Sequence, residues 1–429
     1  MDGLEQEVLA RVEARRAVQV AWTRELVAIP TVNPYAGDAS AGSEKAGQEW
    51  IAGRLTQLGA QVRRVPVPAD VYARGGIIGP ADRCWDGRDN VVAEWVLGDG
   101  QGPVVLLNDH MDTVGTAGMG FDPFDPVVED GCLFGRGSSD SKGNLVMGLV
   151  AVDALLANPT GLHGRVVYAS VVDEECNGSG AGTLACCLAG VTGTLAICLD
   201  GAHGQVDIGC NGVATARLRV QGRAGHGSGQ GAVSALDKAI QVKTAVDHFA
   251  REHAEVYPDC AVNIGVFRAG TLPAIVPGEA ELQVNLNYDI QDAYQAEEQS
   301  GAWDGRFFRT RFQRSLAALP AADEWFGAHP VEVSWVKDLY PFWCDPHQPA
   351  IQTVLGAVAE IRGGPVPCGV NPAWLDAAHL ARQLRVPTVA LGAGAAGAAH
   401  GAGEYAVIDD LAAGARTVAL VLHRLLRRA

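Results

Sequence analysis

Four unbroken apolar runs predict strands that are buried on both faces of a parallel sheet. They lie within 104–112, 165–172, 195–199 and 388–391, and each is rich in Val, Ile or Leu. A continuous run, unlike an alternating one, indicates that both faces of a strand are covered. Two further strand-like segments and six helical segments accompany them: strands 61–67 and 90–96, and helices 4–28, 44–58, 145–157, 178–188, 348–361 and 409–428. The order predicts an α/β fold with a mostly parallel central sheet flanked by helices.

The pattern changes after Gly212 and changes back before the helix at 348–361. Apolar and polar residues alternate in 213–220, as in a strand with one buried face. The predicted elements that follow are a helix at 232–253, strands at 261–267 and 279–288, a helix within 293–319 and a strand at 331–336. This β-α-β-β-α-β order is ferredoxin-like. We therefore expect an inserted domain at 213–338, with 1–212 and 339–429 forming the two parts of the first domain.

Composition and charge exclude several classes of protein. Hydrophobic content of 48%, charged content of 19% and a length of 429 residues predict a globular protein of two domains. The net charge of −16 argues against a nucleic acid or an anionic membrane as the partner. No apolar run approaches the ~18 residues of a membrane span, and the first residues lack the features of a signal peptide. The ten cysteines include no Cys-x-x-Cys pair, which predicts reduced, mostly buried thiols in a cytoplasmic protein.

Polar side chains follow the predicted parallel strands at their carboxyl ends. His110 and Asp112 are two residues apart, so an extended backbone projects both from one face. Three consecutive carboxylates at 173–175 and the single carboxylate of Asp200 end two other strands. Open α/β sheets place their binding sites at this edge, and a cation would relieve the repulsion among adjacent carboxylates. The alternatives to cation binding are a structural role for His110 and, for residues 173–175, an acidic turn exposed to solvent.

Two glycine-rich loops add Asp140 and His400 to the candidates. Asp140 lies in the loop 135–144, directly before a predicted helix, and its charge favours a cation over a phosphate. The alternative for Asp140 is a helix N-cap. In the Gly/Ala-rich loop 392–405, His400 and Glu404 are the only ionisable groups before Tyr405, and the alternative for His400 is a structural role.

Together these segments predict one cluster of nitrogen and oxygen ligands at the sheet edge. Such a set suits Zn²⁺, or alternatively Co²⁺ or Mn²⁺. One carboxylate shared by two ions ~3.5–4 Å apart would create a two-metal hydrolytic centre. The residues of the cluster are His110, Asp140, Glu174, Glu175, Asp200 and His400.

The motifs resemble those of the di-zinc superfamily of acetylornithine deacetylase, succinyl-diaminopimelate desuccinylase, aminoacylase-1 and carboxypeptidase G. The resemblance covers nearly the whole chain and rests on four motifs in order: His110-Met-Asp-Thr-Val, the loop 135–143, Asp173-Glu-Glu175, and His400 with Glu404-Tyr405. It implies that His110 and Asp200 hold one metal, Glu175 and His400 hold the other, and Asp140 bridges them. It also implies that Asp112 orients His110, and that Glu174 is the general base that moves a proton from water to the leaving amine.

The inserted segment looks like the lid and dimerisation domain of that superfamily, which implies a homodimer. His226 would then reach the reacting centre across the dimer and stabilise the oxyanion, the alternative being a loop residue that caps a backbone group. Asn263 also matches the lid segment, and Asp376 matches a late Asp with a supporting role. Asn287 departs from the pattern, because many members carry there an Arg that pairs with a substrate carboxylate. An amide cannot supply that charged fork.

These expectations amount to a zinc-dependent hydrolase of C–N bonds that acts on an N-acyl amino acid or a related N-acylated amine. The enzymatic alternative is a carboxypeptidase or dipeptidase on the same scaffold, which predicts a dipeptide-like substrate with a free carboxylate. The alternative of another class is a non-hydrolytic binding or biosynthetic relative. The complete ligand set and the presence of Glu174 argue against that last alternative.

Overall fold

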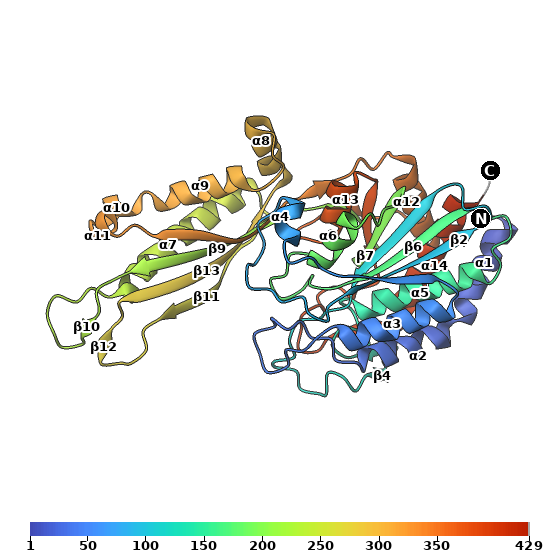
Figure 1. The fold of residues 1–429 in the computed structure, drawn as a ribbon, viewed down its shortest axis with the longest axis horizontal. Coiled ribbons are helices and arrows are strands. Elements are labelled where there is room, and N and C mark those ends of the chain that lie inside the picture. The colour runs from blue at the N-terminus through green and yellow to red at the C-terminus, as the bar shows by residue number, and fades with distance from the viewer. Residues whose placement is uncertain (428–429) are drawn as a thin grey trace.

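The unbroken apolar runs form the centre of a nine-stranded sheet in the computed structural model, which describes residues 1–427 (Figure 1). The strand order is β1-β2-β6-β3-β7-β17-β8-β15, and β16 pairs with β8. The four central strands β6, β3, β7 and β17 are mutually parallel, and every residue of β3 is buried. The bounds are β1 (Gln61–Val65), β2 (Asn90–Leu97), β3 (Val104–His110), β6 (Gly164–Val171), β7 (Leu195–His203), β8 (Val206–Cys210), β15 (Phe342–Trp343), β16 (Cys368–Asn371) and β17 (Thr388–Gly392).

Helices cover both faces of this sheet. Helices α5 and α14 pack against each other and against the central strands on one face, and α6 and α13 pack together on the other (Figure 1). Helix α5 is apolar around nearly its whole circumference because it lies between the sheet and other helices. The bounds are α1 (Gly3–Ala14), α2 (Arg16–Val27), α3 (Lys45–Gln57), α4 (Val71–Gly75), α5 (Lys142–Leu156), α6 (Ala181–Leu188), α12 (Pro349–Arg362), α13 (Ala377–Leu384) and α14 (Ile408–Leu426).

A small three-stranded sheet links two loops that are far apart in the sequence. Its order is β18-β5-β4, with β4 (Val127–Glu129), β5 (Cys132–Phe134) and β18 (Tyr405–Val407). Phe134 lies opposite Tyr405 in the β5–β18 pair. The glycine-rich loop that begins at 135 therefore starts beside the end of the Gly/Ala-rich loop.

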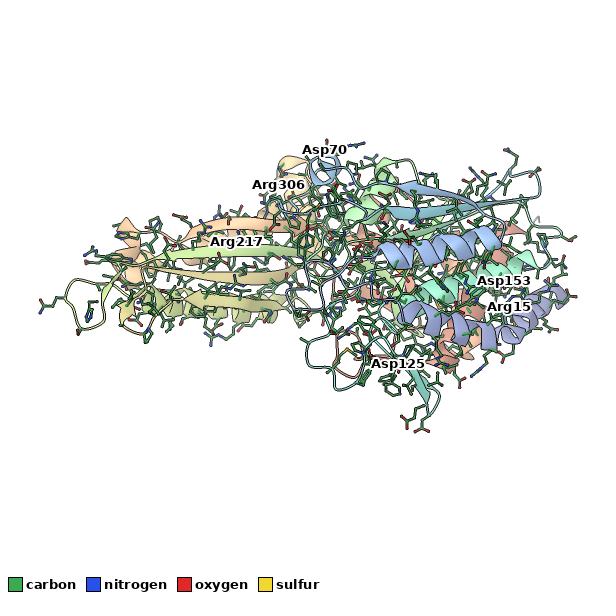
Figure 2. The ribbon with its side chains drawn as sticks, turned by 60° about the horizontal axis from the view of Figure 1, so that its bottom comes forward. Arg15, Asp70, Asp125, Asp153, Arg217 and Arg306 are labelled. Atoms are coloured by element: carbon green, nitrogen blue, oxygen red, sulfur yellow. The ribbon has the colours of Figure 1, made fainter. Side chains whose placement is uncertain are left out.

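The inserted segment forms a smaller lobe with its own sheet and its own core. The sheet order is β11-β13-β9-β14, all antiparallel, which is the ferredoxin-like arrangement predicted from the alternating pattern. Helices α7 and α9 cover one face, and Arg217 of β9 lies on the other (Figure 2). The bounds are β9 (Gly212–Gln221), β10 (Gly225–His226), α7 (Ala235–Val256), β11 (Val262–Ala269), β12 (Ile275–Val276), β13 (Glu279–Tyr288), α8 (Ile290–Ser300), α9 (Arg306–Leu316), α10 (Leu319–Ala322), α11 (Trp325–Ala328) and β14 (Glu332–Leu339).

Some predicted elements differ from the structure. The helix predicted at 4–28 is two helices, because the backbone leaves helical geometry at Arg15 (φ −96°, ψ 2°). The helix predicted within 293–319 is also divided, since α8 ends at Gly301 in the left-handed conformation that glycine adopts readily. The pattern missed the short strands β8, β15 and β16 and helix α13. The last helix, predicted at 409–428, ends at Leu426 in the structure. Residue 428 of that prediction lies outside the described residues.

The described residues also bear on the expectations about membrane spans and cysteines. No helix within residues 1–427 is long and apolar enough to cross a membrane. All ten cysteines lie in this part of the chain as free thiols, and Cys84 and Cys368 are the exposed ones.

Candidate metal centre

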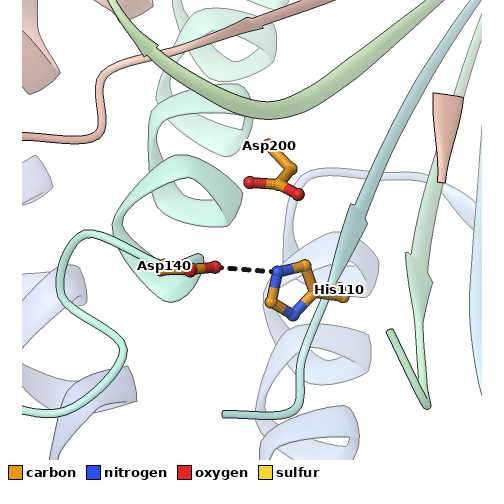
Figure 3. Close-up of side chains that lie close together, drawn as sticks. All are labelled: His110, Asp140 and Asp200. Atoms are coloured by element: carbon orange, nitrogen blue, oxygen red, sulfur yellow. Dashed lines mark hydrogen bonds and ion pairs between the residues drawn. The ribbon is translucent and has the colours of Figure 1, made fainter. Parts of the chain in front are cut away.

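Five predicted ligands from five segments meet at the carboxyl edge of the parallel strands, and Glu174 directly precedes one of them, Glu175. Figure 3 shows His110 at the end of β3 and Asp200 in β7, with Asp140 from the loop before α5 beside them. The potential ligand atoms form two groups, and within each group they lie within 4.8 Å of one another. The groups are His110, Asp140 and Asp200, and Asp140, Glu175 and His400. The two groups share Asp140.

The ring of His110 is held from one side and presents its other nitrogen to the cluster. Its Nδ1 lies 2.9 Å from the backbone oxygen of Asp112, and its Nε2 lies 3.1 Å from Oδ1 of Asp140. A backbone oxygen can only accept, so Nδ1 carries a proton, and in the neutral ring Nε2 has a free lone pair. Burial disfavours the charged ring, but the hydrogen bond with Asp140 raises the pKa of His110, and in the protonated ring Nε2 donates to Asp140. The backbone oxygen of Asp112 therefore accepts the hydrogen bond from His110, and a carboxylate oxygen of Asp112 lies 3.7 Å from the same Nδ1.

The carboxylate of Asp112 instead holds the loop that carries Glu174 and Glu175. It accepts hydrogen bonds from the backbone N–H of Glu174 at 3.3 Å and of Glu175 at 3.0 Å. Asn33 donates its side-chain amide to the same carboxylate at 2.8 Å. Asn33 was not among the predicted site residues, although it lies between two prolines in the short polar segment Pro30-Thr-Val-Asn-Pro34.

The loop that carries Asp140 is held by Glu404, which is fully buried. The Glu404 carboxylate accepts hydrogen bonds from the backbone N–H of Gly137, Ser139 and Asp140 at 3.0–3.1 Å. It also pairs with Arg136 at 2.6 Å. The sequence motif included Glu404 without a role, and the structure shows that it holds the loop of Asp140. The peptide bond between Asp140 and Ser141 is cis.

His400 closes the cluster from the Gly/Ala-rich loop. Its Nε2 lies 3.0 Å from the Glu175 carboxylate and 3.3 Å from Oδ2 of Asp140. Its backbone is left-handed (φ 60°), and its side chain is 56% exposed. His400 therefore lies at the open side of the cluster, opposite the buried His110.

The carboxylates of the cluster outnumber its two imidazole rings, and burial disfavours their charged forms. Burial raises the pKa of Glu175 to about 7 and that of Asp200 to about 6, and the Asp140 charge adds to both shifts. Burial also raises the pKa of Glu174 well above its usual range. Burial opposes the ionisation of Asp140, but hydrogen bonds from His110 and His400 outweigh it and lower its pKa. The pKa of His400 rises to about 11 because Asp140 and Glu175 hydrogen-bond to it.

This donor set fits a pair of divalent cations. Imidazole nitrogens and carboxylate oxygens are ligands for Zn²⁺, Co²⁺ and Mn²⁺, and the shared carboxylate of Asp140 suits a position between two ions. Positive charge at this place would allow the buried carboxylates to ionise together. The ligand set therefore has both the chemistry and the excess negative charge that two metal ions require.

Four other predicted residues lie outside the cluster. His226 is exposed in β10, at the far end of the smaller lobe from the central sheet (Figure 1). Asn263 is exposed and lies opposite Asn285 in the β11–β13 pair. Asn287 donates its amide to the backbone oxygen of Pro372 at 2.8 Å. Asp376 is buried at the start of α13 and accepts a hydrogen bond from Thr183 at 2.6 Å.

The smaller lobe contacts the loop after Glu175 through two side chains. Thr215 of β9 donates to the side-chain oxygen of Asn177 at 3.2 Å. Lys337 of β14 donates to the backbone oxygen of Gly178 at 3.3 Å, and burial lowers its pKa to about 8. The loop that carries two site carboxylates is thus also one of the places where the two lobes meet.

Comparison with known proteins adds a family match. The profile of Peptidase family M20/M25/M40 matches residues 106–424, which include every residue of the two ligand groups.

Curated relatives and solved structures extend the likeness over the whole chain. The chain is 25% identical to N-formyl-4-amino-5-aminomethyl-2-methylpyrimidine deformylase of Halalkalibacterium halodurans, over 95% of this chain and 94% of that protein. It is 28% identical to succinyl-diaminopimelate desuccinylase of Stenotrophomonas maltophilia, over 62% and 67% of the two chains. Its fold resembles that of human carnosine dipeptidase 1, with a TM-score of 0.72 and 16% identity over 99% of each chain.

Proposed function

The chain belongs to Peptidase family M20/M25/M40, whose members hydrolyse amide and peptide bonds, and on this basis we propose that it is a metal-dependent deacylase. It removes the acyl group from an N-acyl amino acid or a related N-acylated amine. The observation that carries the proposal is the pair of ligand groups that share Asp140. Glu174 follows β6 at the same edge and precedes the ligand Glu175.

The proposed ligands divide between two metal ions. His110 and Asp200 would hold one ion, Glu175 and His400 would hold the other, and Asp140 would contribute to both, as the two groups of potential ligand atoms allow. Zn²⁺ is the proposed metal, and Co²⁺ and Mn²⁺ are the alternatives. When bound, the ions polarise the scissile carbonyl and make the attacking water more acidic.

Glu174 is the proposed general base. As a carboxylate, it takes the proton from the attacking water and then delivers that proton to the nitrogen of the leaving amine. The raised pKa of Glu174, caused first by burial, brings it closer to that of the groups with which it exchanges the proton. Asp112 holds the backbone of Glu174 and Glu175, so we assign Asp112 a positioning role.

Two findings favour an acylated amine over a dipeptide. The two curated relatives are a deformylase and a desuccinylase, so both names describe the removal of an acyl group. Asn287 has a neutral amide, and that amide is bonded to Pro372, so it does not supply the charged fork that pairs with a substrate carboxylate. The similarity to human carnosine dipeptidase 1, at 16% identity, bears on the fold and keeps the dipeptidase as the enzymatic alternative.

We further propose that residues 213–338 act as a lid and as the contact between two subunits of a homodimer. His226 lies at the far end of this lobe from its own chain's cluster (Figure 1). A role in stabilising the oxyanion therefore requires the cluster of the partner subunit. The change of sheet between β8 and β9 and between β14 and β15 supports a division near 212 and 338, with Gly212 already in β9 and Leu339 still in β14.

A substrate panel tests the proposal. Protein reconstituted with Zn²⁺ is assayed with N-formyl, N-acetyl and N-succinyl amino acids, with N-acylated amines that lack a carboxylate, and with dipeptides, using ninhydrin detection of the released amine. We expect release from the acylated compounds. Release from dipeptides alone would establish the peptidase alternative. Metal binding without any turnover would favour the non-hydrolytic alternative.

A further inference from the structure

The loop that carries Glu174 and Glu175 has an unfavourable backbone conformation. Asp173, Cys176 and Asn177 have positive φ angles of 67°, 57° and 60°. Left-handed geometry is disfavoured for residues with a side chain, so such residues persist only where their surroundings hold them. The loop therefore depends on contacts outside its own backbone.

The contacts at Asp112 hold only the middle of the loop. They bind the backbone N–H groups of Glu174 and Glu175. The two flanking residues, Asp173 and Cys176, contact a different segment of the chain, residues 83–88. We call this segment the arginine clamp, because Arg83 and Arg88 provide the contacts.

Arg88 joins the loop to helix α3 through two buried carboxylates. Its Nη2 lies 2.5 Å from Oε1 of Glu44 and 3.1 Å from Oδ1 of Asp173, and its Nε lies 2.9 Å from Oε2 of Glu44. The side chains of Arg88, Glu44 and Asp173 are 4%, 0% and 0% exposed. Glu44 directly precedes α3, so one guanidinium fixes Asp173 relative to a helix.

Arg83 holds the other end of the loop. Its Nη2 donates to the backbone oxygen of Cys176 at 3.1 Å, and its guanidinium lies 3.9 Å from the ring centre of Tyr35. Tyr72 adds a hydroxyl donor to Asp173 at 3.4 Å. The arginine clamp therefore contacts the residue before Glu174 and the residue after Glu175.

The chemistry of this cluster favours a geometric role over a stabilising one. Buried ion pairs lose much of their attraction to the desolvation of the charges, and apolar residues that replace every member of a pair often leave stability unchanged, whereas removal of one member is destabilising. A planar guanidinium with several donors, in contrast, fixes the relative positions of two carboxylates. Asp173 is adjacent to the proposed base, so a small shift at Asp173 moves Glu174.

We propose that Arg88 is a positioning residue, which sets the loop of Glu174 and Glu175 in its productive place through Asp173. The proposal rests on the proposed function, since it assigns the loop to metal binding and proton transfer. It predicts that, in the folded variant, loss of Arg88 lowers the metal affinity and kcat while KM stays nearly unchanged.

The test compares Arg88→Met with Arg15→Met. Arg15, at the junction of α1 and α2, forms a two-bond pair with Asp153 of α5, at 2.6 and 3.3 Å (Figure 2). Both proteins are studied below their unfolding temperatures, by zinc titration against a chelating indicator and by kcat and KM. Partners that orient a metal site contribute ~10–100-fold to affinity or activity. We expect losses of that size in zinc affinity and kcat for Arg88→Met, KM within about 2-fold, and wild-type values for Arg15→Met.

Asp173→Asn provides a second variant of nearly unchanged volume, for use where Arg88→Met does not fold. Wild-type zinc affinity and kcat in a folded Arg88→Met or Asp173→Asn protein would overturn the proposal. Equal losses in Arg15→Met would also overturn it, because the effect would then be one of general stability. If the wild-type protein did not bind zinc, that result would instead contradict the proposed function.

Discussion

His400 and Asp140 meet at 3.3 Å between Nε2 and Oδ2, while Oδ1 of the same aspartate contacts His110. Asp140 thus joins the two ligand groups, and Asp140→Asn should weaken both metal sites at once. We expect zinc affinity to fall by more than ~100-fold, beyond the range for an outer partner, with loss of both ions in metal analysis. Asp153→Asn, on the same side of the sheet in α5, is the matched control. Retention of one tightly bound ion would contradict a bridging role.

Glu174→Gln should separate catalysis from metal binding. The amide keeps the size of the side chain but cannot accept a proton, and a positioned base contributes ~10²–10⁴-fold to the rate. We expect kcat to fall by that factor with the metal content unchanged. Glu94→Gln in strand β2 is the matched control, since Glu94 pairs on the surface with Arg165. Turnover close to the wild-type rate would exclude Glu174 as the base.

Glu404→Gln should destabilise the protein through the loop of Asp140. The change leaves the buried Arg136 guanidinium without its charge partner, and breaking a buried pair on one side costs ~3–5 kcal/mol. Urea unfolding of the metal-free protein should show a loss of this order in the free energy of unfolding. A loss below about 1 kcal/mol, the value of a surface pair, would show that backbone contacts alone hold the loop.

Mixed dimers should reveal the place of His226. His226→Ala and Glu174→Gln subunits are each expected to have low activity as homodimers. After mixing and subunit exchange, one site of each heterodimer combines an intact Glu174 with the partner's intact histidine, so activity should return. Size-exclusion chromatography with light scattering confirms the dimer. No recovery despite exchange would contradict action of His226 across the dimer.

The buried His379 should make stability depend on pH. Its ring donates to the Ser179 backbone oxygen and accepts from the Tyr340 hydroxyl, at 2.8 Å each, and burial lowers its pKa to about 4. Because the unfolded chain protonates near pH 6.5, it binds more protons than the folded chain between pH 6.5 and 4. Stability should therefore fall with decreasing pH in that window, by at most about 1.4 kcal/mol per pH unit from this group.

Urea unfolding of the metal-free wild type and His379→Gln at pH 7 and pH 5 measures this contribution. The variant should lose stability at pH 7, where its hydrogen bonds are impaired, and should show a smaller decrease between the two pH values. The same decrease in both proteins would assign the pH dependence to other groups.

The sequence predicted the place of a site residue well where that residue lies at the end of a recognisable strand. His110 and Asp200 each follow a continuous apolar run, and the carboxyl ends of parallel strands converge, so their proximity could be predicted from the pattern. The order of the ferredoxin-like lobe followed from alternation with a period of two. The break at Arg15 could not be predicted in this way, because a single non-helical residue hardly disturbs a helical period.

The contacts that hold the site were harder to predict, because they join segments with no shared pattern. Arg88 and Glu44 lie in polar stretches that resemble ordinary surface, although both are buried in the structure. Glu404 was visible as the ionisable neighbour of His400, but its bonds to the loop of Asp140 depend on the β5–β18 pair. Strand β5 has three residues, too few for a pattern to identify.

Strand β17 enters the sheet between β7 and β8, although it is the last of the nine strands in the sequence. During translation, the ribosome therefore releases β7 and β8 long before the strand that separates them exists. His400 and Glu404 emerge later still. A nascent chain that has not yet reached β17 and His400 has neither the continuous sheet nor the second group of ligands, so the proposed hydrolytic activity begins only after these residues have been synthesised and folded.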